Sequence, residues 1–253
     1  MENVTVNKTE TNSYTFIFAI ALVIVVGTAL AFAATSLQPM QYENQRQEQM
    51  QSILATVGIE TDRAGAQAKY DEHIKEEIVI NAEGEVQEDV EAFEIDLAKE
   101  IKKDPFDQNF PLYIAEVEGE QFYIIPLRGA GLWNAIFGYV ALKEDANTIK
   151  GVVFDHLGET PGLGAEITQL WFRERFADEK IMKDGEIVGV DVAKGQPSTS
   201  KDDNRVDAIS GATITGDGVA DMLEERLKHY QPYFESETAN AANNYYYGTG
   251  NKE

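Results

Sequence analysis

An unbroken apolar run near the start of the chain is the strongest pattern in this sequence. Residues 14–34 are apolar or small throughout, and no charged residue occurs between Glu10 and Glu43. A helix rises about 1.5 Å per residue, so about 20 apolar residues cross a hydrocarbon layer of about 30 Å. We therefore predict one membrane-spanning helix over residues 14–35.

A cleaved signal peptide, processed after Ala33, is the alternative interpretation of this run. Signal peptides have a basic start and an apolar stretch of about 7–15 residues. Here a single Lys8 stands between Glu2 and Glu10, and the apolar stretch is longer. The pattern favours an uncleaved anchor, and the mass of the mature chain would decide between the two.

Beyond the anchor, the apolar positions change to helical spacing. Within residues 41–57 they recur at i, i+3, i+4 and i+7, at Met50, Ile53, Leu54 and Val57. This spacing predicts an amphipathic helix that ends at Gly58 and packs on the following domain. Other helices are predicted over 64–74, along the stripe Phe93, Leu97 and Ile101 before Pro105, over 165–176, and from about Asp217 with Thr215 or Asp217 as N-cap.

Shorter apolar runs between turn residues predict β-strands, at 76–80, 112–117, 121–127, 136–143, 149–156 and 186–192. Short polar turns join the second run to the third and the fourth to the fifth, which predicts two antiparallel hairpins. The predicted fold class is α+β, an antiparallel sheet with flanking helices, anchored by one N-terminal transmembrane helix. The predicted segments are a tail (1–13), the transmembrane helix (14–35), a helical connector (36–63), a folded domain (64–235), which includes a polar loop at 194–205, and a disordered acidic, Asn- and Tyr-containing tail (236–253).

Charge and composition exclude several classes of function. The net charge of -23 argues against nucleic acid and against an anionic lipid surface, because both require a basic face. The absence of cysteine excludes disulfides, thiol nucleophiles and cysteine-ligated iron–sulfur clusters. If the chain carries electrons, it needs an organic cofactor or a centre on another subunit.

Common catalytic and nucleotide-binding motifs are missing from the sequence. His73, His156 and His229 form no metal-ligand spacing, so no metal site is expected. No P-loop and no dinucleotide-binding glycine motif after a strand occurs, so the chain offers no site for NADH. A single membrane helix without charge is no ion pathway.

The stretch Ser210-Gly211-Ala212-Thr213-Ile214-Thr215 carries the most distinctive candidate chemistry. Gly211 and Ala212 leave room for a ligand to approach the backbone, and a helix start just beyond favours a phosphate. The stretch therefore indicates a phosphate site with a threonine hydroxyl inside it. An ordinary Ser/Thr-rich loop that caps a helix is the alternative.

Two other loops have unusual glycine content, Gly131-Leu132-Trp133-Asn134 and Gly158-Glu159-Thr160-Pro161-Gly162-Leu163-Gly164-Ala165. In the second loop, glycines bring backbone N–H groups close to a ligand and a proline stiffens the approach. Alone, each loop is equally explained by an ordinary turn, with Trp133 as a core residue.

These motifs together carry a resemblance. They resemble three motifs of the C-subunit family of sodium-translocating NADH:quinone reductases, which follow one another along the chain in the family's order. The motifs here are the loop 131–134, the loop 158–165 and Asp207-x-x-Ser210-Gly211-Ala212-Thr213. The likeness covers nearly the whole chain and fades after Tyr230. It implies that a flavin transferase attaches FMN through its phosphate to Thr213, with Asp207 serving the attachment step.

The resemblance also implies which residues contact the flavin, and none of them is expected to be catalytic. The phosphate would lie among Ser210, Gly211, Ala212, Thr213, Ile214 and Thr215. The polar edge of the ring would face Glu159, Thr160, Gly162 and Gly164, and the apolar walls would be Leu163, Leu132 and Trp133.

The implied function is electron transfer within a larger complex that passes electrons from NADH to quinone. The chain would be a single-pass subunit of the bacterial inner membrane, not catalytic alone, with its flavin domain on the periplasmic side and other flavin and iron–sulfur subunits as partners. Two alternatives remain open: the corresponding flavin subunit of a ferredoxin-linked complex, and a membrane-tethered interaction module without redox function.

Overall fold

The computed structural model describes residues 12–195 and 200–238. The predicted terminal tails, up to residue 11 and beyond residue 238, lie outside the described residues, as do residues 196–199 of the predicted polar loop. The chain divides into two compact units, residues 1–48 and 49–253.

Helix α1 (Asn12–Thr56) provides the described part of the first unit. It is long and apolar enough to cross a membrane, with a mean hydropathy of 2.8 in its most apolar window and none of that window buried. Large apolar side chains such as Phe16, Val25 and Phe32 are exposed, as lipid-facing residues would be. The predicted apolar helix is therefore present.

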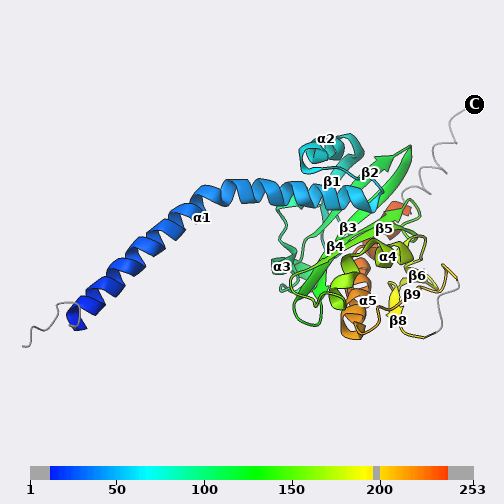
Figure 1. Ribbon diagram of the computed structural model, residues 1–253. Helices are drawn as coiled ribbons and strands as arrows, with labels where there is room; N and C mark the ends of the chain where they lie inside the picture. Colours follow the sequence, from blue (N-terminus) through cyan, green and yellow to red (C-terminus); the bar gives the residue numbers. More distant parts are fainter. Residues whose placement is uncertain (1–11, 196–199, 239–253) are drawn as a thin grey trace, which may run out of the picture. The chain divides into compact units, whose positions relative to one another are not determined.

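A five-stranded antiparallel sheet forms the centre of the second unit, in the order β1-β2-β3-β4-β5 (Figure 1). Its strands are β1 (Ile74–Ile80), β2 (Phe110–Val117), β3 (Glu120–Ala130), β4 (Ala135–Lys143) and β5 (Ile149–His156). The pairs Ala115–Phe122 and Val140–Val152 belong to the two predicted hairpins. This sheet and its helices confirm the predicted α+β class.

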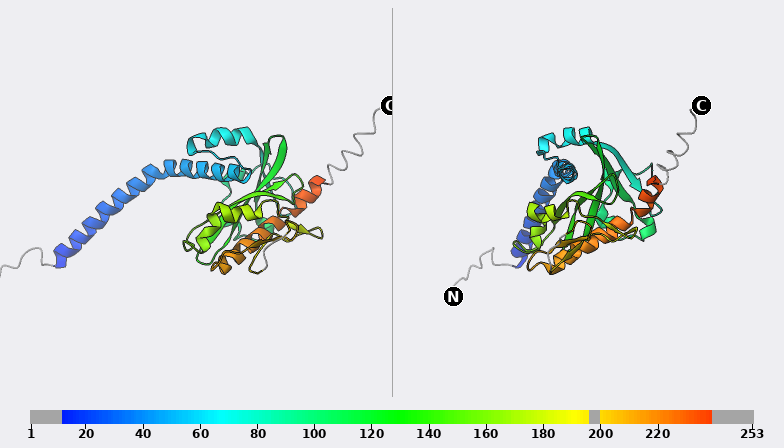
Figure 2. Two further views of the ribbon diagram at one scale, coloured as in Figure 1. Left: turned by 45° about the vertical axis from the view of Figure 1, so that its right-hand side comes forward. Right: turned by 90° about the vertical axis from the view of Figure 1, so that its right-hand side faces the viewer.

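Both faces of the sheet are covered, because side chains along each strand alternate between them. In β3, Phe122 and Ile124 join one core cluster, while Ile125 and Leu127 join the other. The first cluster includes the end of α1 and helix α2 (Arg63–His73), which are shown beside the sheet in Figure 2. As predicted, Met50, Ile53 and Leu54 of α1 are buried there, together with Val57 just after the helix.

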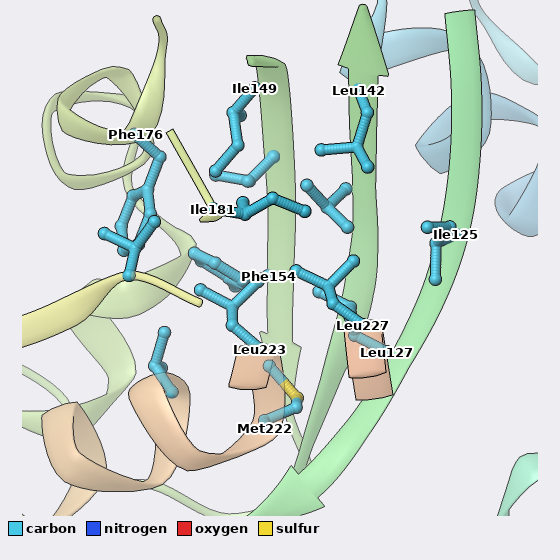
Figure 3. Close-up of a cluster of buried hydrophobic side chains, with 14 of the residues drawn as sticks. Ile125, Leu127, Leu142, Ile149, Phe154, Phe176, Ile181, Met222, Leu223 and Leu227 are labelled. Carbon is cyan, nitrogen blue, oxygen red and sulfur yellow. The ribbon is translucent and has the colours of Figure 1, made fainter. Parts of the chain in front are cut away.

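Helix α5 (Thr213–Lys228) covers the other face of the sheet. Figure 3 shows Met222, Leu223 and Leu227 directed toward the strand residues Leu127 and Phe154. This cluster fixes α5 against the strand that leads into the loop 131–134. A further helical stretch, residues 231–238, follows α5 and includes residues 236–238 of the predicted tail.

The prediction of one continuous helix over 165–176 is wrong. The structure has three short pieces, η4 (Gly164–Thr168), α4 (Leu170–Arg173) and η5 (Glu174–Phe176). The extended backbone of Gln169 ends the first piece, and the break brings Phe172 and Phe176 together against Phe154. The stripe around Phe93 is likewise two short pieces, η2 (Ala92–Glu94) and α3 (Leu97–Glu100), with η3 (Pro105–Asp107) after them.

The predicted strand over 186–192 is also interrupted. Gly189 has a φ of 69°, a left-handed conformation that separates β7 (Glu186–Ile187) from β8 (Asp191–Ala193). β7 forms a small antiparallel hairpin with β6 (Met182–Lys183). β8 pairs in parallel with β9 (Arg205–Asp207), which leads into the stretch 210–215.

Candidate functional site

A cavity of about 250 Å³ lies at the N-terminal end of α5. Three separate segments line it: the loop after β3, the loop after β5 and the stretch before and within the first turn of α5. The lining residues are Leu132, Glu159, Thr160, Leu163, Gly164, Gly211, Ala212, Thr213, Ile214 and Thr215. All ten belong to the site residues that the sequence singled out, so the structure brings the three motifs to one place.

Helix α5 begins earlier than the sequence predicted. Its first residue is Thr213 and its N-cap is Ala212, rather than Thr215 or Asp217. The first turn contains threonine, isoleucine and glycine, which have low helix propensity, so the sequence pattern did not predict it. Close packing explains why glycine occupies two positions near the start of this helix. A side chain at Gly218 would collide with the carbonyl of Ala130, and one at Gly216 would press on Val192.

The corrected start places Thr213 at a helix N-terminus. Backbone N–H groups there lack intrahelical partners, and the helix dipole favours negative charge. The first turn of α5 contains no acidic residue, and the N-cap makes no side-chain hydrogen bond. The end of α5 that faces the cavity is therefore suited to a phosphate.

The two threonines of the first turn have opposite surroundings. Thr215 is 1% exposed, and its hydroxyl donates to Oε2 of Glu159 at 2.8 Å. Thr213 is exposed and lines the cavity. Of these two hydroxyls, only that of Thr213 is presented to an enzyme that approaches from solvent.

Glu159 is a buried carboxylate between the loops. Oε1 accepts a hydrogen bond from the amide of Trp133 at 2.9 Å, and Oε2 accepts from Thr215. Burial raises the pKa of Glu159, but hydrogen bonds from the Trp133 amide, the Thr215 hydroxyl and the Asn134 amide outweigh it, so the pKa is lower than usual. The carboxylate is therefore ionised at neutral pH.

Apolar side chains border the cavity. Leu132, Leu163 and Ile214 remain substantially exposed although they line it. Gly211 has a φ of 79°, and a Cβ there would lie 2.8 Å from Leu163, so this position requires glycine. Exposed apolar side chains around a hollow are typical of a ligand site.

Four predicted site residues do not line the cavity: Asp207, Ser210, Gly162 and Trp133. Ser210 is exposed next to the cavity residue Gly211. The amide of Gly162 donates to Glu166 at 3.2 Å. The indole N–H of Trp133 donates to Thr160 Oγ1 at 3.2 Å, so this exposed side chain lies directly beside the cavity.

Comparison with known proteins decides the family. Residues 131–228 match the family model described as FMN-binding domain. The C subunit of the Na(+)-translocating NADH-quinone reductase of Pseudomonas aeruginosa is 30% identical over 212 residues, which cover 75% of this chain and 81% of that protein. The chain belongs to this family of C subunits.

Solved structures agree with membership of the C-subunit family. The crystal structure of the family member from Parabacteroides distasonis is 39% identical, with a TM-score of 0.72 over 78% of this chain and 96% of that chain. The structure of Shewanella oneidensis NqrC is 27% identical, with a TM-score of 0.67 over 77% of this chain and 99% of that chain.

Sequence reasoning missed one residue near the site of this family member. Arg175 donates a hydrogen bond from Nη1 to the carbonyl of Asp207 at 2.5 Å, and its guanidinium lies 4.8 Å from the ring centre of Trp171. It therefore holds the end of β9, from which the stretch 210–215 departs. No motif marks Arg175, because its partner is a main-chain carbonyl far away in the sequence.

Proposed function

We propose that this chain is the flavin-carrying electron-transfer subunit of a sodium-translocating NADH:quinone reductase, with FMN joined through its phosphate to Thr213. The observation that carries the proposal is the single cavity at which Thr213, the loop 158–165 and Leu132 meet. The match of residues 131–228 to an FMN-binding domain supports the choice of cofactor.

The first turn of α5 would hold the phosphate. Thr213 Oγ1 would lose its proton and bond to the flavin-side phosphorus of an activated flavin nucleotide held by the transferase, as the bond from that phosphorus to the departing phosphate group breaks. The free N–H groups of the helix start would face the phosphate oxygens. Asp207 lies at the end of β9 and does not line the cavity, which is consistent with a role in the attachment step rather than in holding the finished cofactor.

The apolar border of the cavity would hold the ring. Leu132, Leu163 and Ile214 offer apolar contact from three different segments of the chain, with Trp133 beside them. Thr160 Oγ1 accepts from the Trp133 indole, which leaves the hydroxyl proton free to donate to a polar atom of the ring. A flavin bound here supplies the electron-accepting and electron-donating chemistry, and the protein supplies position and polarity.

The cavity is smaller than the roughly 300–1,000 Å³ of sites that enclose a drug-sized ligand. At about 250 Å³ it would leave a flavin partly exposed. Partial exposure suits a carrier that exchanges electrons with other subunits, and it makes a covalent bond useful, because the non-covalent contacts are few.

Helix α1 would anchor the protein in the bacterial inner membrane, with the flavin domain on the periplasmic side. Its partners would be the other subunits of the complex, and a flavin transferase would attach the FMN. The absence of cysteine is consistent with electron transfer through an organic cofactor of this chain.

Flavin fluorescence in a denaturing gel tests the attachment. The full chain is co-expressed with a flavin transferase as wild type, as Thr213→Ala and as the control Thr238→Ala, which changes a threonine outside the cavity. We expect fluorescent bands for wild type and control and none for Thr213→Ala. Fluorescence in all three would place the bond elsewhere. A folded wild type that shows no fluorescence, although the transferase is active, would favour the alternative of a membrane-tethered interaction module without redox function.

A further inference from the structure

The carboxylate of Glu159 joins three segments that are far apart in the sequence. It comes from the loop after β5, and it accepts from the Trp133 amide of the loop after β3 and from the Thr215 hydroxyl of α5, at 2.9 Å and 2.8 Å. Glu159 and Thr215 are both buried, with exposed fractions of 4% and 1%. Both residues also line the cavity.

We propose that Glu159 and Thr215 are positioning residues, whose hydrogen bond sets the first turn of α5 so that the Thr213 hydroxyl faces the flavin transferase. The helical repeat explains how. Successive residues turn by about 100°, so side chains two positions apart point to nearly opposite sides of the helix. Directing Thr215 into the protein therefore directs Thr213 outward.

This hydrogen bond adds to the backbone packing of Gly216 and Gly218 in holding the first turn of α5. Its N-cap makes no side-chain hydrogen bond, and Gly216 and Gly218 weaken the helix that follows. Helix ends fray readily when they lack such contacts. The Thr215–Glu159 contact instead ties a side chain of this turn to the loop after β5.

Close packing keeps the Glu159 carboxylate in place. A Cβ at Gly131 would lie 2.5 Å from Oε1, and a Cβ at Gly164 would lie within 3.0 Å of both Glu159 and Thr215. The backbone approaches the carboxylate on both sides, so the side chain has little room to change its conformation. Hydrogen bonds to an ionised acceptor are also stronger than neutral ones.

Two substitutions of Thr215 separate the hydroxyl from the shape of the side chain. Thr215→Val keeps the shape and removes the donor, whereas Thr215→Ser keeps the donor. The rate of flavin attachment is followed on the full chain with limiting flavin transferase. We expect Thr215→Val to slow attachment by about two- to tenfold, the effect of one lost hydrogen bond, and Thr215→Ser to restore most of the rate.

The proposal is overturned if folded Thr215→Val attaches flavin at the wild-type rate, or if Thr215→Ser is as slow as Thr215→Val. Should Thr215→Val fail to fold, Glu159→Asp and Glu159→Gln take its place. Asp keeps the charge but is too short to reach both partners, while Gln keeps the reach. We expect Gln to attach flavin faster than Asp, and the reverse order would contradict a positioning role.

This inference rests on the proposed function for its rate measurement, so a second measurement separates the two. Hydrogen exchange of the Trp133 amide is measured in the flavin-free full chain. Thr215→Val should speed this exchange and Thr213→Ala should not, because of these two threonines Thr215 is the one that donates a hydrogen bond to Glu159. A wild type that never takes up flavin refutes the proposed function alone, whereas unchanged exchange in Thr215→Val refutes the positioning role.

Discussion

The two ends of α5 are built from opposite kinds of residue. At its N-terminal end, Thr213, Gly216 and Gly218 are small, and the helix opens on a cavity. Toward its C-terminal end, Leu227 is fully buried, and just past the end the buried Tyr230 donates from its hydroxyl to the carbonyl of Pro111 at 2.8 Å.

This difference shows how one helix serves both stability and ligand contact. Large buried side chains near the C-terminal end fix the helix on the sheet, whereas the N-terminal end packs through small residues that let other segments approach its backbone. The small residues there leave the backbone N–H groups accessible. Changes near the C-terminal end should therefore affect folding, and changes at the N-terminal end should affect flavin attachment.

Leu227→Ala should show the largest effect on folding. Removing a fully buried leucine side chain leaves a cavity against the sheet and should lower the free energy of unfolding by about 2–5 kcal/mol. Urea unfolding of the detergent-solubilised full chain measures it, with the exposed Lys228→Ala as control. Equal stability of the two variants would contradict the anchoring role of this end.

His229 should make the same end of α5 sensitive to acid. Burial and the neighbouring Arg226 lower the pKa of His229 to about 4, and its ring stacks on Phe110 at 4.4 Å. The unfolded chain, with a histidine pKa of about 6.5, binds the proton more readily, so stability should fall as the pH drops from about 6.5 to about 4. For this partly exposed ring we expect about 1–2 kcal/mol, after allowing for solvent screening.

The variant His229→Phe keeps an aromatic ring on Phe110 and cannot titrate. Unfolding curves at several pH values should show a smaller loss of stability in this variant than in wild type between about pH 6.5 and about pH 4. An identical slope in both proteins would assign the acid sensitivity to other groups.

Thr213→Ala should have the smallest effect on folding, although it removes all covalent flavin. Thr213 is exposed, so the free energy of unfolding of the flavin-free chain should change by less than about 0.5 kcal/mol. Thr215→Ala, two residues on, removes a donor from the buried Glu159 and should cost about 1–3 kcal/mol. An equal loss of unfolding free energy in the two variants would contradict the different surroundings of the two hydroxyls.

The sheet was predictable because its strands carry local signals. The runs 112–117 and 121–127 flank a turn with Gly119 at a φ of 84°, and both strands form where expected. The parallel pair β8–β9 was not predicted. Residues 191–192 lie in the predicted strand 186–192, but β9 is only three residues long and has a single apolar residue, Val206. Short strands of this kind depend on the neighbours that they pack against.

The site was predictable as a set of motifs but not as a geometry. The sequence singled out all ten residues that line the cavity, and their binding role stays a prediction. It placed the helix start too late, because the packing of Gly216 on the Val192 side chain and of Gly218 on the Ala130 carbonyl is invisible in the sequence. It also gave Glu159 only a ligand contact, whereas the structure shows bonds to Trp133 and Thr215.

The tight fit around Gly164 has an evolutionary consequence. A side chain at this position would meet both Glu159 and Thr215, and one at Gly131 would meet Glu159. A lineage that gains a side chain at either glycine must therefore replace the carboxylate or lose its contact. Among members of the family, these four positions should covary, and glycine at 131 and 164 should persist wherever the acid at 159 is retained.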